Sequence, residues 1–455
     1  MAAVLVILLS TLAVAFSARQ LPPAIRRLVA LCFLAHLAGA AAQVWMHTDY
    51  YGGGDMLTYM RNGRPIARLV EADPARWVPE LLRLLVHVDN ELPFVHGTGG
   101  TSGTMVGIGA IFVVLFRDPL PLWEVCLLVG ATSTLGQVVI CKAALSMFPE
   151  ENVHHSVALG ILLVPSVVFW SSALTKEAIA LPFLAILLAS TVGVAKGRWT
   201  TSIFGLIVGT MGVGLVKGYL LMPFVLAVAV AAYVGKNSLG ANGKRKFGWL
   251  SAVAAFAIAA VGLAGVSAVF PQYSPGSIAE TTSSYQLTYE KLDGMGVAGS
   301  NVDFEEAGDV SMLGQLKLVP LAAVNALFRP MFFEARSVVQ LAASFETLAV
   351  VVLLLRLLKF GPRRALREVV SSPPLAFCGV FVITFAVAVG LSTLNLGTLS
   401  RYRIPMMPFF TVLLFVLGQR IRAQKPIVAD NPDRMGLRAA AARNRERILA
   451  QRPHA

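Results

Sequence analysis

An acid directly after three glycines is the first place where this sequence could do chemistry, in YYGGGDMLTY from Tyr50 to Tyr59. Glycines permit backbone conformations closed to other residues and let a ligand approach closely. The periodic apolar residues after Asp55 predict a helix that begins there, where an acid stabilises the helix N-terminus. The same carboxylate could instead accept a proton from an incoming hydroxyl. Tyr59 lies one turn later on the same face, and Asp49 is the fallback base or a partner.

Basic residues interrupt apolar sequence at two later points. The segment VPSVVFWSSALTKEA places Lys176 and Glu177 at the junction of two apolar stretches, and Lys217 lies alone within GLVKGYLLMP. The charges of Lys176 and Glu177 could be topology anchors, and the Lys217 side chain could reach the membrane surface. Ionisable groups at membrane depth are costly, however, and by default suggest a functional site. The functional interpretation is a phosphate-binding lysine with a neighbouring acid.

Arginines mark two further segments, LFRPMFFEA with Arg329 and LSRYRIPMMPFF with Arg401, Tyr402 and Arg403. A guanidinium donates two parallel hydrogen bonds to a phosphate or diphosphate, so paired arginines just before an apolar stretch suit such a ligand. Glu346 lies inside the apolar segment LAASFETLAVVVLLL. It needs a partner, which an arginine or lysine of these clusters could supply.

The elements that must position these residues follow from the composition. The 455 residues are 56% hydrophobic and only 14% charged, and the mean hydropathy is +0.70. These values predict a polytopic, all-α membrane protein rather than a set of soluble domains. The net charge of +13 is then assigned to cytoplasmic loops, and no basic stretch with interleaved aromatic residues indicates nucleic-acid binding. The four cysteines lack metal-ligand spacing and are interpreted as core residues.

The apolar segments and the basic loops together predict a topology. The stretch 104–116 is short for a crossing, and we expect it to be re-entrant or interfacial. Clusters of Lys and Arg place the loops 19–27 and 236–246 on the cytoplasmic side, which is consistent only if 104–116 does not cross. The N-terminus is then outside and the C-terminus is cytoplasmic. We expect eleven crossings, by residues 2–17, 28–46, 120–141, 156–173, 177–195, 201–217, 219–234, 249–270, 337–357, 374–392 and 404–421.

This topology defines a transmembrane domain over residues 1–422 and a basic cytoplasmic tail over 423–455. Two large loops face the extracytoplasmic side: 47–103, with an amphipathic helix predicted at 67–88, and 271–336. One or two acids and up to five cations collect on that side. Such a face fits group transfer from a lipid phosphate, because the acid can activate a hydroxyl while the cations stabilise the departing phosphate.

Five segments together resemble the GT-C superfamily of polyprenyl-phosphate-dependent membrane glycosyltransferases, and their order along the chain strengthens the resemblance. They are GGGDMLTYMRNGRPIARL, HGTGGTSGTMVGIGAIFVVLF, VPSVVFWSSALTKEA, LFRPMFFEA and LSRYRIPMMPFF. The chain looks most like bacterial membrane proteins of polysaccharide gene clusters, over residues 45–415. In that superfamily an acid in the first extracytoplasmic loop is a catalytic base or a metal-associated residue, and Asp55 matches its position.

The resemblance implies an inner-membrane glycosyltransferase of the hexosyltransferase type. Its donor would be a polyprenyl-phosphate or polyprenyl-diphosphate sugar, and its acceptor a hydroxyl of a lipid-linked molecule or glycan, in cell-surface polysaccharide or glycolipid assembly. No organic cofactor is implied, and the lack of an Asp-x-Asp pair in the sequence leaves a divalent metal open.

Two other interpretations remain: a transporter or flippase of lipid-linked oligosaccharide, and a non-catalytic scaffold of an envelope complex. An enzyme should gather Asp55 and Arg401 at one external site. A scaffold should scatter the same polar residues over separate surfaces.

Overall fold

Helices dominate the structure, a computed structural model that describes residues 2–93, 100–118, 120–238, 260–270, 312–359, 361–393 and 395–423, together with residues 277, 284 and 287. No β-strand occurs in these ranges, so the expected all-α class is confirmed. The tail predicted at 423–455 lies, from residue 424 on, outside the described residues. Most of 271–311 lies outside them as well.

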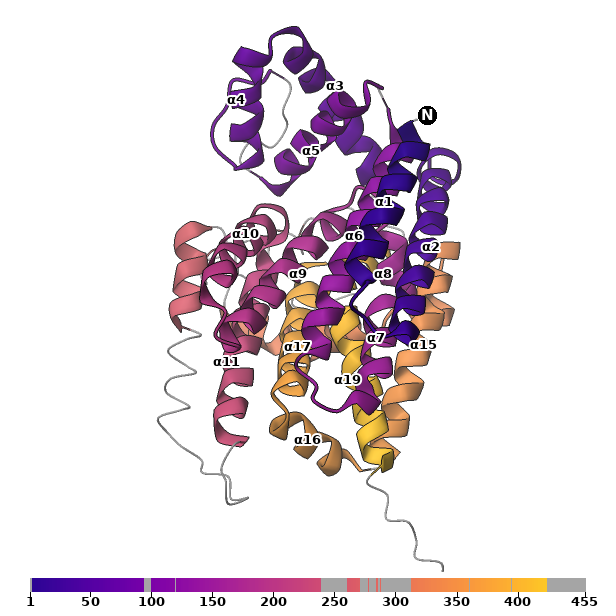
Figure 1. The fold of residues 1–455 in the computed structure, drawn as a ribbon, viewed down its shortest axis with the longest axis vertical. Coiled ribbons are helices and arrows are strands. Elements are labelled where there is room, and N and C mark those ends of the chain that lie inside the picture. Colours follow the sequence, from indigo (N-terminus) through magenta and orange to yellow (C-terminus); the bar gives the residue numbers. More distant parts are fainter. Residues whose placement is uncertain are drawn as a thin grey trace, which may run out of the picture.

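The helices form a bundle with a smaller group of helices at its upper end (Figure 1). The first half of the chain contributes α1 Ala2–Ala18, α2 Pro23–Trp45, η1 Met46–Tyr50, α3 Asp55–Ala72, α4 Pro74–Leu85, α5 Thr101–Phe116, α6 Leu122–Leu145, η2 Glu151–Val153, α7 His154–Leu162, α8 Pro165–Trp170, α9 Lys176–Ala195, α10 Trp199–Lys217, η3 Gly218–Leu220 and α11 Leu221–Ser238. The second half contributes α14 Met312–Phe328, η5 Phe332–Glu334, α15 Val338–Lys359, α16 Pro362–Ser371, α17 Pro373–Ser392, α18 Leu396–Tyr402, η6 Ile404–Met406 and α19 Met407–Ala423.

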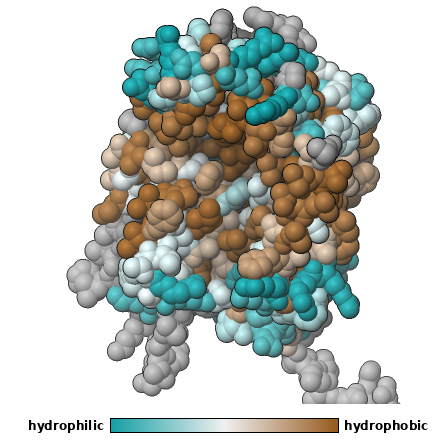
Figure 2. Space-filling view, turned by 45° about the horizontal axis from the view of Figure 1, so that its top comes forward, coloured by the Kyte–Doolittle hydropathy of each residue, from teal (hydrophilic) through white to brown (hydrophobic). Residues whose placement is uncertain are grey.

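Within the described ranges, seven helical segments are long and apolar enough to cross a membrane. A crossing needs about 20 apolar residues, and the chain is therefore a polytopic membrane protein. Figure 2 shows the corresponding surface, with polar residues at both ends and a hydrophobic band between them that is hollowed below the polar upper end. The seven segments are Pro23–Tyr50, Leu122–Leu145, Lys176–Ala195, Trp199–Lys236, Val338–Lys359, Pro373–Ser392 and Leu396–Ala423.

Helices α3, α4 and α5 form a cap at the upper end of the bundle (Figure 1). Glycines allow the backbones of α3 and α5 to touch: a Cβ atom at Gly63 would lie 2.5 Å from the Ala110 nitrogen, and one at Gly109 would lie 2.6 Å from the Tyr59 carbonyl oxygen. The short apolar stretch 104–116 thus belongs to α5, whose apolar residues cover the buried face of α3. The predicted helix start at Asp55 is confirmed.

The prediction of one continuous amphipathic helix at 67–88 is wrong, because two helices share this segment. Helix α3 ends at Ala72 and α4 begins at Pro74. Asp73 between them caps α4, because its Oδ1 accepts a hydrogen bond of 3.2 Å from the backbone nitrogen of Arg76. An aspartate followed by proline is a typical helix start, and this signal outweighs the apolar periodicity that runs across it.

The apolar segment 156–173 was also expected to be one helix, and the structure divides it. Helix α7 ends at Leu162 and α8 begins at Pro165, because proline lacks a backbone N–H and moves the preceding residue out of the helical conformation. Helix α8 ends at Trp170, and residues 171–175 are non-helical before α9 begins. The break lets the charged first turn of α9 lie within the protein.

The predicted loop 271–336 is corrected at its C-terminal end, which contains α14. Pro320 lies inside this helix. Helix α14 packs against α17, and Gly390 provides the contact: a Cβ atom there would collide with the carbonyl group of Ala322. Part of the expected loop is thus a helix of the bundle.

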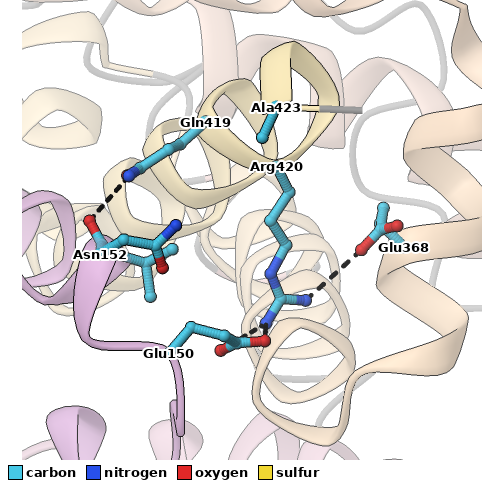
Figure 3. Close-up of a pocket in the computed structure, with 7 residues that line it drawn as sticks. Glu150, Asn152, Glu368, Gln419, Arg420 and Ala423 are labelled. Carbon is cyan, nitrogen blue, oxygen red and sulfur yellow. Dashed lines mark hydrogen bonds and ion pairs between the residues drawn. The ribbon is translucent and has the colours of Figure 1, made fainter. Parts of the chain in front are cut away.

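At the lower end of the bundle, Arg420 of α19 connects two other elements (Figure 3). Its Nη2 lies 3.0 Å from Oε1 of Glu150, which precedes η2, and its Nη1 lies 3.5 Å from Oε2 of Glu368 on α16. Beside these pairs, Gln419 donates a hydrogen bond of 2.7 Å to the carbonyl of Asn152. These residues line a small pocket far from the cap, and the contacts fix α16 against the bundle.

Candidate functional site

Asp55 and Arg401, which are far apart in sequence, form an ion pair below the cap. The Nη2 atom of Arg401 lies 2.8 Å from Oδ2 of Asp55, and the Asp55 side chain is 45% exposed. Asp55 is the first residue of α3, directly after Gly54, whose φ of 115° strongly favours glycine. Arg401 lies on the short helix α18, whose start is capped by Asn395. The acid predicted as base and one of the predicted phosphate-binding arginines therefore lie at one place.

A second, buried carboxylate lies on the other side of Arg401. Glu177 is 1% exposed, and its Oε1 lies 2.5 Å from Nζ of Lys217, which is 3% exposed. The second carboxylate oxygen, Oε2, lies 3.7 Å from Nε of Arg401. Arg401 thus connects the exposed Asp55 to the buried pair, and the pair fixes the position of the guanidinium from behind.

The start of α9, which carries Lys176 and Glu177, is held by neighbouring polar groups. Thr175 caps the helix by accepting a hydrogen bond of 3.1 Å from the backbone nitrogen of Ala178. On α2, Gln43 donates a hydrogen bond of 2.9 Å to the carbonyl of Phe169, close to the break before α9. These contacts satisfy backbone groups that the break leaves without helical partners.

Lys176 reaches towards the first turn of α5 rather than towards an acid. Its Nζ donates to Oγ1 of Thr101 at 2.8 Å and to Oγ of Ser102 at 3.1 Å. Within the described part of the chain, no carboxylate lies within ion-pair distance of this ammonium group. Lys176 therefore provides a positive charge, two neighbouring hydroxyls and the N-terminus of a helix, all of which favour an anion.

Aromatic rings surround the cations of the cluster. The Tyr402 ring centroid lies 4.5 Å from Nζ of Lys217 and 5.3 Å from Cζ of Arg401, distances at which a ring attracts a cation. Tyr59 is buried, and burial followed by the nearby Asp55 charge raises the pKa of its phenol above the ordinary value. Tyr59 therefore keeps its proton and acts as a neutral hydrogen-bonding group.

The charges of this cluster do not balance. The three cations Lys176, Lys217 and Arg401 face two carboxylates, Asp55 and Glu177, which leaves one net positive charge when all five are ionised. An anionic ligand would neutralise that excess.

The structure places Arg403 in a different environment from Arg401. Arg403 is 1% exposed, and it donates 2.9 Å and 3.1 Å hydrogen bonds to the Arg329 carbonyl and to Oγ1 of Thr347. It also lies 3.8 Å from Glu346, whose carboxylate accepts hydrogen bonds from the backbone and the hydroxyl of Ser166. Arg403 is thus the partner that Glu346 was expected to need, and it connects α15 to the residues after α18.

Two other predicted residues lie outside the cluster. The Arg329 guanidinium pairs with Glu334. Partial burial acts to raise the pKa of Glu334, but the Arg329 guanidinium and the backbone N–H of Met331 hold that pKa below its usual value. Asp49 is exposed and accepts a hydrogen bond of 2.5 Å from the neighbouring Thr48 hydroxyl.

Sequence reasoning missed several groups that the structure adds to the site. Thr101 and Ser102 contact Lys176, and the Trp170 ring centroid lies 5.9 Å from Cζ of Arg401. His47 is buried beside Gly54. The three glycines of HTDYYGGGD indicate that a side chain or ligand packs closely against this segment. His47 is such a side chain, since it packs against Gly54.

Neither a search for metal-binding groups nor comparison with known proteins assigns a further role to these residues. Over the described ranges, no group of three or more His, Cys, Asp or Glu side chains is placed to hold a metal ion. Comparison with family models, curated proteins and solved structures finds no match to this chain.

Proposed function

We propose that this protein is a membrane glycosyltransferase that moves a sugar or glycan from a polyprenyl-(di)phosphate donor to an acceptor hydroxyl. The observation that carries the proposal is the position of Arg401 between two carboxylates: the exposed Asp55 at 2.8 Å and the buried Glu177 at 3.7 Å. A cation that can exchange an exposed acid for a phosphate, next to an acid that can accept a proton, combines the two functions that such a transfer needs.

Donor binding would begin at Lys176 and Arg401. The phosphate takes hydrogen bonds from the Lys176 ammonium and from the hydroxyls of Thr101 and Ser102, which already lie together. The Nη2 group of Arg401 then releases Asp55 and donates to the phosphate instead. The geometry of a phosphate suits a guanidinium. Glu177 and Lys217 keep the rest of the guanidinium in place during this exchange.

The exchange leaves Asp55 free to act as the base. Its carboxylate takes the proton of the acceptor hydroxyl as the hydroxyl oxygen forms a bond to the anomeric carbon of the sugar. The bond from that carbon to the phosphate oxygen breaks, and the phosphate leaves with the electron pair. Lys176 and Arg401 stabilise the negative charge that develops on the phosphate, which is commonly the largest contribution to catalysis in such sites.

We also propose that the site faces the extracytoplasmic side of a bacterial inner membrane, with eleven crossings and a cytoplasmic C-terminus. The distribution of basic side chains supports this orientation, since cytoplasmic ends carry an excess of Lys and Arg. At the end of the bundle away from the cap, Arg356 and Lys359 end α15, Arg363 lies on α16, and Arg420 and Arg422 end α19 (Figure 1).

The test uses cells in which this chain supports glycan assembly, with Asp55→Asn compared with Asp49→Asn. The proposal expects Asp55→Asn to abolish the glycan product at normal protein level while lipid-linked intermediate accumulates on the outer leaflet. Asp49→Asn removes a carboxylate six residues away that does not contact the cluster, and it should leave the product unchanged. Intermediate trapped on the inner leaflet would indicate a flippase, and full product from Asp55→Asn would remove Asp55 from the role of base.

A further inference from the structure

His47 is a buried imidazole whose hydrogen bonding leaves one nitrogen available as a base. It lies on η1, a π-helical turn at the end of α2, and is 5% exposed. Its Nδ1 lies 2.9 Å from the carbonyl oxygen of Gln43. A carbonyl can only accept, so Nδ1 carries the hydrogen and the neutral ring has its lone pair on Nε2. In the described part of the chain, Nε2 has no hydrogen-bond partner.

The free edge of this ring faces the start of α3. A Cβ atom at Gly54 would lie 2.8 Å from Cδ2 and 3.1 Å from Nε2 of His47. Asp55 follows Gly54 directly, and the charged groups that act on the ring from other elements are the Asp55 carboxylate and the Arg401 guanidinium. On its own turn, Asp49 is exposed and hydrogen-bonded to Thr48. Single π-helical turns are frequent at functional sites.

We propose that His47 is a second proton-carrying residue of the site, which receives at Nε2 the proton that Asp55 takes from the acceptor hydroxyl. This inference rests on the proposed transferase function. In the step itself, the O–H bond of the Asp55 carboxyl breaks, an N–H bond forms at Nε2, and the ring becomes imidazolium. Asp55 returns to the carboxylate, and its negative charge stabilises the new cation.

The direction of the transfer follows from the chemistry of the two groups. A carboxylate can pair with Arg401 again when the phosphate has left, whereas a protonated carboxyl cannot. The His47 ring then loses its proton to water, and the site is restored to the state that the structure shows.

The closing experiment measures sugar transfer from a polyprenyl-phosphate sugar, with the full chain in lipid nanodiscs, between pH 5 and pH 8. In the wild type, the rate should fall about tenfold per pH unit below the pKa of the ring, because only the neutral ring can accept a proton. His47→Gln should lower the rate at pH 7.5 at least about tenfold. It should also remove the fall in rate at low pH, which is the acid limb of the pH profile. His155→Gln, which removes an exposed histidine on α7, is the matched control and should retain the wild-type profile.

The double variant His47→Gln with Asp55→Asn separates proton transfer from a structural role. Two residues that handle the same proton in series are not additive, so the double variant should be no slower than Asp55→Asn alone. Additive losses, or an acid limb that persists in His47→Gln, would overturn the assignment while leaving the transferase function intact. A wild-type protein that transfers no sugar would overturn both.

Discussion

Lys217 and Glu177 form an ion pair of 2.5 Å with almost no exposure to solvent, at 3% and 1% of their side-chain surfaces. Removing one partner of a buried pair leaves an uncompensated charge, which costs about 3–5 kcal/mol. Glu177→Gln should therefore lower the free energy of unfolding by about that amount, measured by thermal unfolding in detergent. The double variant Glu177→Gln with Lys217→Met should recover part of the loss. Equal stability of Glu177→Gln and the wild type would show that the pair does not form.

Arg401 and Arg403 are two residues apart but should respond differently to substitution. Arg401→Gln should reduce sugar transfer at least about 100-fold, a typical loss for a group that stabilises developing charge, while the melting temperature changes little because Glu177 keeps its bond to Lys217.

Arg403→Gln should instead destabilise the fold. It leaves the buried Thr347 hydroxyl, the Arg329 carbonyl and the nearby Glu346 without their cation, which costs about 3 kcal/mol. Transfer rate and melting temperature, measured on the same preparations, would contradict this division if the two variants had the same phenotype.

Gly54 should tolerate substitution by alanine far less well than Gly53 does. Gly54→Ala forces a side chain into a backbone conformation with φ of 115° and places its Cβ 2.8 Å from His47. We expect a loss of about 1–3 kcal/mol in stability, together with a large loss of transfer. Gly53→Ala is the control, because the nearest atom to a Cβ there lies 3.9 Å away. Wild-type transfer by Gly54→Ala would exclude a constraint at this position.

Lys176 should influence the donor more than the chemical step. Its ammonium group contacts only hydroxyls among the described residues, so Lys176→Gln removes a charge that a bound phosphate would use. We expect the KM for the polyprenyl-phosphate sugar to rise about tenfold, the value of one charged hydrogen bond. The control Lys196→Gln removes an exposed lysine at the lower end, where its Nζ contacts the Ser146 carbonyl. An unchanged KM in Lys176→Gln would remove this residue from the donor site.

The class of the fold was predictable because apolar periodicity and length decide which segments become membrane helices. The breaks between α3 and α4 and between α7 and α8 were not predicted. The residues that cause them, Asp73 and Pro165, are local features within longer apolar patterns. The same limit applies to α14, which contains Pro320 and lies within the predicted loop 271–336. Packing against α17 keeps that helix continuous.

The residue types of the site were predictable, but their partners were not. Charges at turns between apolar segments identified Lys176, Glu177, Lys217 and Arg401 as candidates, because such charges need a reason in a membrane protein. Nothing in the sequence distinguishes Arg401 from Arg403. The end of α18 at Tyr402 turns one arginine towards Asp55 and the other towards α15, and that choice depends on tertiary packing.

We propose that Arg401 exchanges Asp55 for the phosphate of the donor when the donor binds. The most direct test is binding of polyprenyl phosphate to the full chain in nanodiscs, combined with single-turnover transfer from the corresponding sugar donor. We expect Asp55→Asn to bind polyprenyl phosphate at least as tightly as the wild type, since its arginine is released, and yet to transfer sugar only at a small residual rate. Arg401→Gln should bind at least about tenfold more weakly. Weaker binding by Asp55→Asn, or transfer at the wild-type rate, would contradict the exchange.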